Sequence, residues 1–456
     1  MNRTGEALEF VGAFESTFQP HHDVDVLEST GHVERFHSDL ALLSAFGIRR
    51  LRYPVRWHRV EAEPGRLDWS ETDRTLGELQ AWGFDPIVDL VHHTSYPAWL
   101  DEGFADPRFP DAFLRYCEAF AKRYPWIRAY TLINEPFSTL FLCGHEAVWP
   151  PYRRGIEPFT AMLCNVLPAF GRAVTMYHDL LPAAQHVYTD TCEHHTGDPG
   201  VHYVSLANDR RFFVIDAMTG RLTDSTDRPF CRDVLEAGGE DLFEIPPTTI
   251  DVLGLDYYAH SQWNFGRTVS STPSPNPISF AALIAQYGER FGLPMMVTET
   301  NVRGHPSDRA TWLKYTLEQC ELARAAGWPL QGYCWFPFLD SCDWDSLLFR
   351  ADGNVDPVGV YWVDEHGHRR PSTMSRAFAL ACAGASAATL PAYRLRPPVA
   401  HWLGGFQRHM AHWDWQEPPV EMLANGLDAE QTVFELFARD EGPDDGQEGL
   451  ESVAAG

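Results

Sequence analysis

The chain has few basic residues for its length. Its 456 residues include 36 Lys and Arg against 63 Asp and Glu, which gives a formal net charge of −27. Phosphate backbones and anionic lipid headgroups repel a protein this negative. The sequence also contains no uninterrupted apolar run that approaches the ~18 residues typical of a membrane span. We therefore expect neither a nucleic-acid partner nor a membrane partner.

Paired cysteine motifs are absent as well. The nine cysteines are scattered, odd in number and never spaced as C-x-x-C. This pattern does not favour a disulfide framework or a zinc ribbon. The opening MNRTGEALEF has neither an apolar core nor a small-residue cleavage site, so we expect no signal peptide. The histidines do not form an H-E-x-x-H motif, and we expect no metal and no cofactor. A reducing cytoplasm is the simplest expected compartment.

Short, nearly continuous apolar stretches alternate with segments whose apolar residues recur every three or four positions. The first kind is typical of strands that are covered on both faces, and the second of amphipathic helices. Strands are predicted at 9–13, 50–55, 86–91, 127–133, 186–189, 251–258, 294–298 and 332–338, and helices at 33–46, 71–82, 111–123, 159–181, 280–291 and 309–326. This alternation predicts an α/β fold, a (β/α)8 TIM barrel. The alternative is an open doubly wound sheet, but the Gly-rich phosphate loop usual in that fold is missing.

The predicted barrel occupies residues 1–385, and residues 386–456 form a C-terminal extension rich in Trp, His and Pro. We expect the aromatic part of this extension to pack on the barrel rather than to shape the entrance of a site. Residues 439–456 are acidic and glycine-containing, and we expect them to be mobile.

Two glutamates stand at the ends of predicted strands. Glu135 follows the fourth strand within Asn134-Glu135-Pro136, and Glu299 ends the seventh. In a barrel, the carboxyl ends of the strands share one mouth. Two carboxylates facing each other there are what glycoside hydrolysis requires. Each glutamate alone could instead be a strand-end cap or an ion-pair partner.

The two segments resemble motifs of the retaining β-glycosidases of glycoside hydrolase family 1. Leu132-Ile133-Asn134-Glu135-Pro136 looks like T-x-N-E-P, and Val297-Thr298-Glu299-Thr300-Asn301 looks like I-T-E-N-G. The resemblance runs from about residue 9 to about residue 380 and places the two motifs in order on the expected strands. It implies that Glu135 is the general acid/base and Glu299 the nucleophile.

Further matches imply residues that support the nucleophile. Arg52, in a segment like Y-R-F-S-x-x-W, would lie beneath Glu299 and favour its ionised form. Tyr258, in a segment like L-G-L-N-Y-Y, would donate to Glu299, and Asn134 would contact the sugar's 2-hydroxyl. The structural alternatives are an Arg52 ion pair and a tyrosine packed in the barrel wall.

The resemblance also implies sugar-binding residues. Gln19 would be a bidentate hydroxyl partner, and His93 a hydroxyl contact beside an interior His92. Trp335 would be the platform beneath the sugar, unless it is only core, and Asp343 and Trp344 would follow it at the outer sugar hydroxyls.

Three departures from the family pattern bear on specificity. Thr94 stands in place of an aromatic wall and predicts a wider pocket. Asp343 stands in place of Glu, which leaves the choice between glucose and galactose open. Asp256 replaces an Asn near Glu299, and we expect either an acidic pH optimum or a protonated Asp256. Asp190 and Glu193 follow the fifth strand and are expected to be solvated loop carboxylates rather than aglycone contacts.

The sequence as a whole predicts a retaining exo-β-glycosidase that hydrolyses small β-linked glycosides or oligosaccharides without a cofactor. An endo-β-glycanase or a transglycosidase of the same clan would use the same residues. A carbohydrate-binding barrel without turnover is the alternative of another class. The sugar, the aglycone and the oligomeric state stay open.

Overall fold

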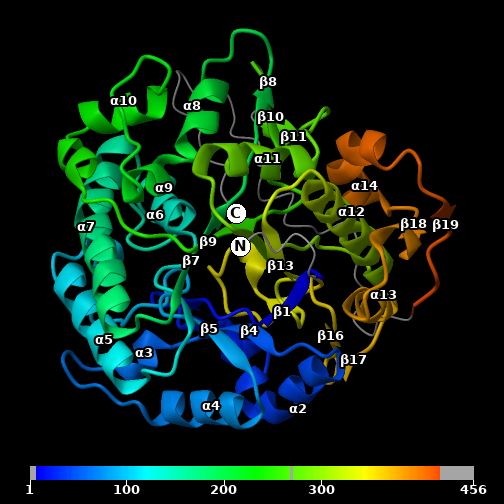
Figure 1. Cartoon of the computed structure of the whole chain (residues 1–456), viewed down its shortest axis with the longest axis horizontal. Helices are drawn as coiled ribbons and strands as arrows, with labels where there is room; N and C mark the ends of the chain where they lie inside the picture. The colour runs from blue at the N-terminus through cyan, green and yellow to red at the C-terminus, as the bar shows by residue number, and fades with distance from the viewer. Residues whose placement is uncertain (1–6, 268–270, 422–456) are drawn as a thin grey trace.

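The structure is a computed structural model in which residues 7–267 and 271–421 are described. Eight parallel strands form a closed barrel at its centre (Figure 1). In chain order the strands are β1 (Glu9–Ala13), β4 (Arg50–Pro54), β5 (Asp85–Asp89), β6 (Ala129–Thr131), β7 (Gln185–Thr191), β9 (Val252–Asp256), β12 (Met295–Glu299) and β13 (Leu330–Cys334). β13 pairs with β1 and closes the ring. The predicted TIM barrel is confirmed, and the open sheet is excluded.

Every barrel strand is covered on both faces. The five residues of β9 and the five of β12 are all buried, as expected for parallel strands between a filled interior and a layer of helices. The interior of the barrel is filled by apolar side chains of medium size, among them Val11, Ile87, Val187 and Met296.

A ring of helices surrounds the barrel (Figure 1). The six predicted helices are present as α2 (His32–Ala45), α4 (Ser70–Ala81), α5 (Phe109–Arg123), α7 (Ile156–Leu180), α11 (Phe280–Phe291) and α12 (Pro306–Ala325), and α13 (Thr373–Cys382) follows β13. The ends of α11 illustrate why the prediction is accurate there. Ser279 caps its N-terminus by accepting from the Ala282 N–H, and Gly292 ends it with a φ of +65°.

Helix α7 is long and apolar enough, by length and composition alone, to cross a membrane. Within the structure 61% of its most apolar window is buried, and it packs along α5 (Figure 1). The expectation of no membrane partner stays a prediction.

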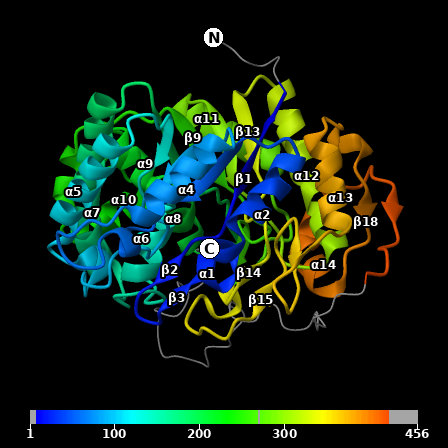
Figure 2. The same cartoon turned by 90° about the horizontal axis from the view of Figure 1, so that it is seen from below.

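The carboxyl ends of the strands carry the shorter elements, several of which gather at one end of the barrel (Figure 2). The short helices are α1 (Val26–Ser29), α3 (Trp57–Val60), α6 (Pro136–Gly144), α8 (Tyr203–Arg210), α9 (Phe213–Met218), α10 (Pro229–Glu236) and α14 (Pro397–Leu403). The short strands are β2 (Phe18–Gln19), β3 (Val24–Asp25), β8 (Thr196–Gly197), β10 (Trp263–Phe265), β11 (Ser271–Pro273), β14 (Ser341–Cys342), β15 (Val355–Asp356), β16 (Trp362–Val363), β17 (Arg369–Arg370), β18 (Ala392–Tyr393) and β19 (Trp415–Gln416).

Residues 386–421 pack against α12. The Lys314 ammonium donates to the carbonyls of Ala387, Ala388 and Leu390 at 2.8, 2.9 and 2.8 Å, and the Trp413 indole donates to Glu318 at 3.0 Å. The division of the chain at residue 385 stays a prediction, and the segment 439–456, expected to be mobile, lies outside the described residues. All nine cysteines lie in the described part and are unpaired; the cytoplasmic location stays a prediction.

Candidate active site

Three buried carboxyl groups meet at the carboxyl ends of the strands. Glu135 follows β6, Asp256 ends β9 and Glu299 ends β12. One oxygen of each lies within 4.8 Å of one oxygen of each of the others. The barrel therefore brings the two predicted catalytic glutamates together and adds Asp256 as a third acid.

Glu299 is held by donors on both of its oxygens. Arg52 Nη1 donates to Oε1 at 2.6 Å, and the Tyr258 hydroxyl donates to Oε2 at 2.6 Å. Arg52 also donates through Nη2 to Asn134 Oδ1 at 2.6 Å and to Asp89 Oδ2 at 3.2 Å. Arg52 thus joins β4, β5, β6 and β12, and it fixes the orientation of Glu299 through a charge-assisted bond.

Glu135 sits at a strained position. Its φ is +42°, in the left-handed region, and α6 begins at the next residue. Behind it, Asp190 caps α6 by accepting the Phe137 N–H at 2.8 Å. The Tyr188 hydroxyl donates to the same oxygen of Asp190 at 2.9 Å. Asp190 is therefore a buried helix cap, and its assignment as a solvated loop carboxylate was wrong.

The environment of Glu135 favours its neutral form. Burial raises the pKa of Glu135 well above its ordinary value, and the negative charge of Glu299 raises it further, as does Asp256 when it is ionised. Burial also raises the pKa of Asp190, to about 6.

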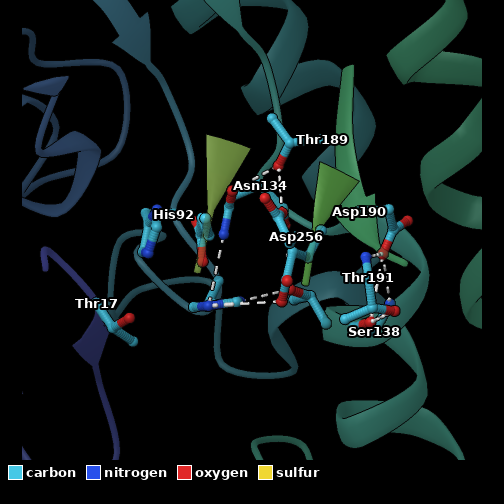
Figure 3. A network of polar contacts seen from close by, with 12 residues as sticks. Thr17, His92, Asn134, Ser138, Thr189, Asp190, Thr191 and Asp256 are labelled. Atoms are coloured by element: carbon cyan, nitrogen blue, oxygen red, sulfur yellow. Dashed lines mark hydrogen bonds and ion pairs between the residues drawn. The ribbon is translucent and has the colours of Figure 1, made fainter. Parts of the chain in front are cut away.

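Asp256 is linked to Asn134 through Thr189 (Figure 3). The Thr189 hydroxyl oxygen lies 2.9 Å from Asn134 Oδ1 and 2.9 Å from Asp256 Oδ2. One hydroxyl proton cannot serve two acceptors, so a proton on Asp256 completes this chain of hydrogen bonds. Burial and the neighbouring Glu299 raise the pKa of Asp256 well above its ordinary value, which favours the same protonated form.

His93 faces Glu135 as a neutral imidazole. The Thr139 hydroxyl donates to the Asn134 carbonyl at 3.1 Å, so it accepts from His93 Nδ1 at 2.8 Å. The other ring nitrogen, Nε2, is then an acceptor, 4.0 Å from Glu135 Oε2. Burial and the charges of His92 and Arg52 lower the pKa of His93 well below its ordinary value.

These groups open into a cavity with an empty volume of about 970 Å³, its mouth included. Of the predicted residues, His93, Glu135, Tyr258, Glu299 and Trp344 line it; other lining residues include Glu15, Leu142, Trp149, His260, Arg303, Phe336 and Asp356. The Trp149 indole donates to the Leu347 carbonyl at 3.0 Å. This bond joins the segment after β6 to the segment after β13 over the cavity.

Phe336, and not the predicted Trp335, lines the cavity, so we propose Phe336 as the platform. Trp335 is 1% exposed, and its indole donates to the Val358 carbonyl at 2.7 Å in the packed core. Phe336 lines the cavity, stacks on His92 with ring centroids 5.7 Å apart, and lies 5.6 Å from the Arg52 guanidinium. The sequence held the signal: the segment from Gly332 to Phe336 resembles the family's G-Y-x-x-W, and the Trp of that motif falls on Phe336.

Gln19 and Asp343 are not among the residues that line this cavity, and their predicted sugar contacts stay predictions. Gln19 Oε1 accepts the His21 N–H at 2.9 Å, and its amide nitrogen donates to the Tyr152 hydroxyl at 3.3 Å. Asp343 accepts the Asn354 N–H at 2.9 Å and is 1% exposed. The His21 N–H and the Tyr152 side chain thus hold Gln19, and a backbone N–H holds Asp343.

Of two further positions in the His92 segment, Thr94 departs from expectation and His92 lies as expected. Thr94 is fully buried, and its hydroxyl donates to the Phe18 carbonyl at 2.8 Å; it braces a loop and does not widen the pocket. His92 contacts Asp89 Oδ2 through Nδ1 at 2.8 Å, as an interior histidine would.

Sequence reasoning did not single out Glu15, Arg303 or Asp356, which also line the cavity. Glu15 comes from the segment between β1 and β2. Arg303, after β12, and Asp356, in β15, form an ion pair. Residues 12–19 resemble the family's G-A-A-T-S-x-Y-Q, in which Thr stands at the position of Glu15. That departure was the available signal.

The three acids could by distance hold a divalent cation, and they are the one such group found in the described residues. Glu299, however, already uses both oxygens for Arg52 and Tyr258. The expectation of no metal stays a prediction.

Comparisons with known proteins bear on this site. The sequence model described as Glycosyl hydrolase family 1 matches residues 10–274, which include Glu135 and end before Glu299. Beta-glucosidase A of Thermotoga maritima is 22% identical over 384 residues, covering 74% of this chain and 83% of that protein. A 6-phospho-beta-glucosidase of Dickeya chrysanthemi is 30% identical over 160 residues, covering 33% of this chain and 34% of that protein.

The fold has solved counterparts. A beta-glucosidase from Thermotoga maritima in complex with deoxynojirimycin superposes with a TM-score of 0.68 at 19% identity, over 82% of this chain and 97% of that one. Because the family model spans more than half of the sequence and the barrel carries the two glutamates at its mouth, this chain belongs to glycosyl hydrolase family 1 and is a glycoside hydrolase.

Proposed function

We propose that this glycoside hydrolase is a retaining exo-β-glycosidase with Glu135 as acid/base and Glu299 as nucleophile. The observation that carries the proposal is the separation of the two acids, whose oxygens approach within 4.8 Å. Retaining enzymes hold their carboxyl groups ~5–5.5 Å apart, whereas inverting enzymes need ~6.5–9.5 Å to admit a water.

In the proposed first step, Glu299 attacks the anomeric carbon while Glu135 gives its proton to the leaving oxygen. The carbon–oxygen bond to the aglycone breaks and a glycosyl–Glu299 bond forms. The raised pKa of Glu135 supports its role as the acid, because the side chain must be protonated when the substrate binds.

In the second step, the aglycone has left and Glu135 is a carboxylate. It takes a proton from water, whose oxygen attacks the anomeric carbon and releases Glu299. The released Glu299 carboxylate again accepts hydrogen bonds from Arg52 and Tyr258, which hold it in its starting orientation. Asn134 accepts from Arg52 at 2.6 Å, and the family resemblance gives its amide the contact with the sugar's 2-hydroxyl.

The shape of the cavity supports exo action. The segment after β13 contributes Phe336, Trp344, Leu347 and Asp356 to the lining, and the bond from Trp149 to Leu347 closes that side. An endo-acting enzyme needs a groove that is open at both ends to admit a polymer.

The proposed substrate is a β-glucoside or a closely related β-glycoside. The support comes from the relatives, which carry the name beta-glucosidase over three quarters of this chain. The cavity is lined by aromatic rings and a few convergent polar groups, as sugar-sized ligand sites are.

The proposal is tested by release of 4-nitrophenol from aryl β-glucoside, galactoside, fucoside, mannoside, xyloside and glucuronide. Wild type should turn over at least one of them, and Glu299→Gln should remove that activity. Proton NMR of the first-formed sugar should show the β-anomer. An α-anomer would contradict retention, and silence of wild type on every glycoside would favour a sugar-binding barrel.

Two further readouts separate the alternatives of the same clan. Cleavage of long β-glucans at internal bonds, measured by product length, would favour an endo-β-glycanase. Alkyl glycosides formed in preference to free sugar at low added alcohol would favour a transglycosidase.

A further inference from the structure

Glu15 lies in the cavity although no predicted role required it there. It belongs to the segment between β1 and β2, is 5% exposed and lines the cavity together with Glu299 and Phe336. The family pattern has Thr at this position. A buried carboxylate facing a sugar-sized cavity is costly unless it has partners.

One oxygen of Glu15 is fully engaged. Oε1 accepts the N–H of Ser16 at 2.9 Å, the N–H of Thr17 at 2.9 Å and the Thr17 hydroxyl at 2.7 Å. Across the described ranges 7–267 and 271–421, the other oxygen, Oε2, accepts no hydrogen bond. The carboxylate is therefore fixed in orientation and has one acceptor to spare.

The loop that carries Glu15 is braced by the segment after β5. The Phe18 N–H donates to the Ser95 hydroxyl at 2.8 Å, and the Thr94 hydroxyl donates to the Phe18 carbonyl at 2.8 Å. Such bracing keeps Glu15 in place before any ligand arrives, which lowers the entropic cost of binding.

The surroundings locate Glu15 relative to the sugar. His92 Nε2 lies 3.5 Å from Glu15 Oε1, and the same His92 ring stacks on Phe336. Glu15 thus stands beside the proposed sugar platform. Gln19, to which the family resemblance gave the hydroxyl-binding role, is turned toward Tyr152 instead.

We propose that Glu15 is a specificity-determining residue whose free Oε2 accepts a hydrogen bond from a hydroxyl group of the glycone. This inference rests on the proposed glycosidase function. A carboxylate accepts hydrogen bonds and donates none, so Glu15 selects sugars that present a hydroxyl donor at this point. Sugars that are deoxygenated or O-alkylated there lose the bond.

The test compares 4-nitrophenyl β-glucoside with its 3-deoxy, 4-deoxy and 6-deoxy forms; if another glycone is the better substrate, its own monodeoxy forms are used. In wild type, one deoxy substrate should lose roughly 10- to 100-fold in kcat/KM, as expected for a hydrogen bond to a charged group. In Glu15→Ala the ratio of kcat/KM for the parent glycoside to kcat/KM for that deoxy substrate should fall to near one. Glu15→Gln, which keeps an Oε1 acceptor for Ser16 and Thr17, should reduce the ratio while the melting temperature stays close to that of wild type.

Gln19→Met is the matched control, because it alters the residue that the family pattern would favour. It should leave the ratio of parent to deoxy substrate unchanged. A ratio that persists in both Glu15 variants at every position, or that collapses in Gln19→Met instead, would overturn the proposal for Glu15. Inactivity of wild type toward all glycosides would overturn the proposed function itself, which is a distinguishable result.

Discussion

Arg52 Nη1 lies 2.6 Å from Glu299 Oε1, and the second terminal nitrogen of the same guanidinium lies 2.6 Å from Asn134 Oδ1. One planar group thus sets the distance between the strand that carries the proposed nucleophile and the strand that leads to the proposed acid. Arg52 is 3% exposed, so water does not compete with these bonds.

We expect Arg52→Lys to lower kcat/KM by roughly 10²- to 10³-fold, because an ammonium cannot reproduce the two-pronged geometry of the guanidinium. Tyr258→Phe, which removes a single bond to Glu299, should cost less. Steady-state kinetics with the best aryl glycoside measures both. An Arg52→Lys variant as fast as wild type would contradict the role of Arg52.

Asp256→Asn should move the alkaline limb of the pH–kcat/KM profile to lower pH. Asp256 is one of the groups that raise the pKa of Glu135. Once Asp256 ionises as pH rises, its negative charge holds the proton on Glu135. Asn cannot ionise, so in the variant Glu135 should lose its proton at lower pH, and activity that needs this proton should fall earlier as pH rises. The control is Asp343→Asn, which alters a carboxyl group outside the cavity lining. An unchanged profile in Asp256→Asn would count against the coupling and would show that Asp256 stays neutral across the pH range tested.

Phe336→Ala should reduce kcat/KM roughly tenfold or more through lost contact with the sugar. Trp335→Phe should leave KM nearly unchanged but lower stability by about 1–3 kcal/mol, because the Val358 carbonyl loses its donor. Kinetics and thermal unfolding of the two variants separate these effects. A large loss of kcat/KM in Trp335→Phe, together with normal kinetics in Phe336→Ala, would indicate that Trp335 is the platform.

Chelation should not affect activity. The three acids approach within 4.8 Å, but Arg52 places a positive charge against Glu299 where a cation would have to bind. We expect dialysis against EDTA, followed by Mg²⁺, Ca²⁺, Mn²⁺ or Zn²⁺, to leave kcat/KM within experimental error. A loss that one of these ions restores would show that the acids hold a metal.

Gly254→Ala should destabilise the barrel by about 1–3 kcal/mol through overpacking. A Cβ there would lie 2.4 Å from the Thr298 hydroxyl oxygen and 2.9 Å from the Tyr188 carbonyl oxygen, both on neighbouring strands. The control, Gly77→Ala, adds a methyl to α4 where no atom lies within 4 Å, and should stabilise by about 0.5–1 kcal/mol. Denaturant unfolding of both variants measures the difference, and equal stabilities would refute the close approach at Gly254.

Residues of the cavity show how far sequence reasoning reached. Glu135 and Glu299 were found because each follows an apolar strand, and Arg52 and Tyr258 because they lie in segments like known motifs. Phe336 was missed by one position of register, and a shift of one residue at the end of a strand moves a side chain to the other face.

The sequence by itself determined the barrel and its two central acids, since apolar strands, amphipathic helices and the motifs beside them are local patterns. Only the tertiary structure decided that Glu15 faces the cavity while Gln19 turns to Tyr152, and that Asp190 caps α6 behind Glu135. The direction of a loop side chain depends on partners far away in the chain, such as Ser95 for the loop of Glu15. Such contacts exist only once the eight strands have closed.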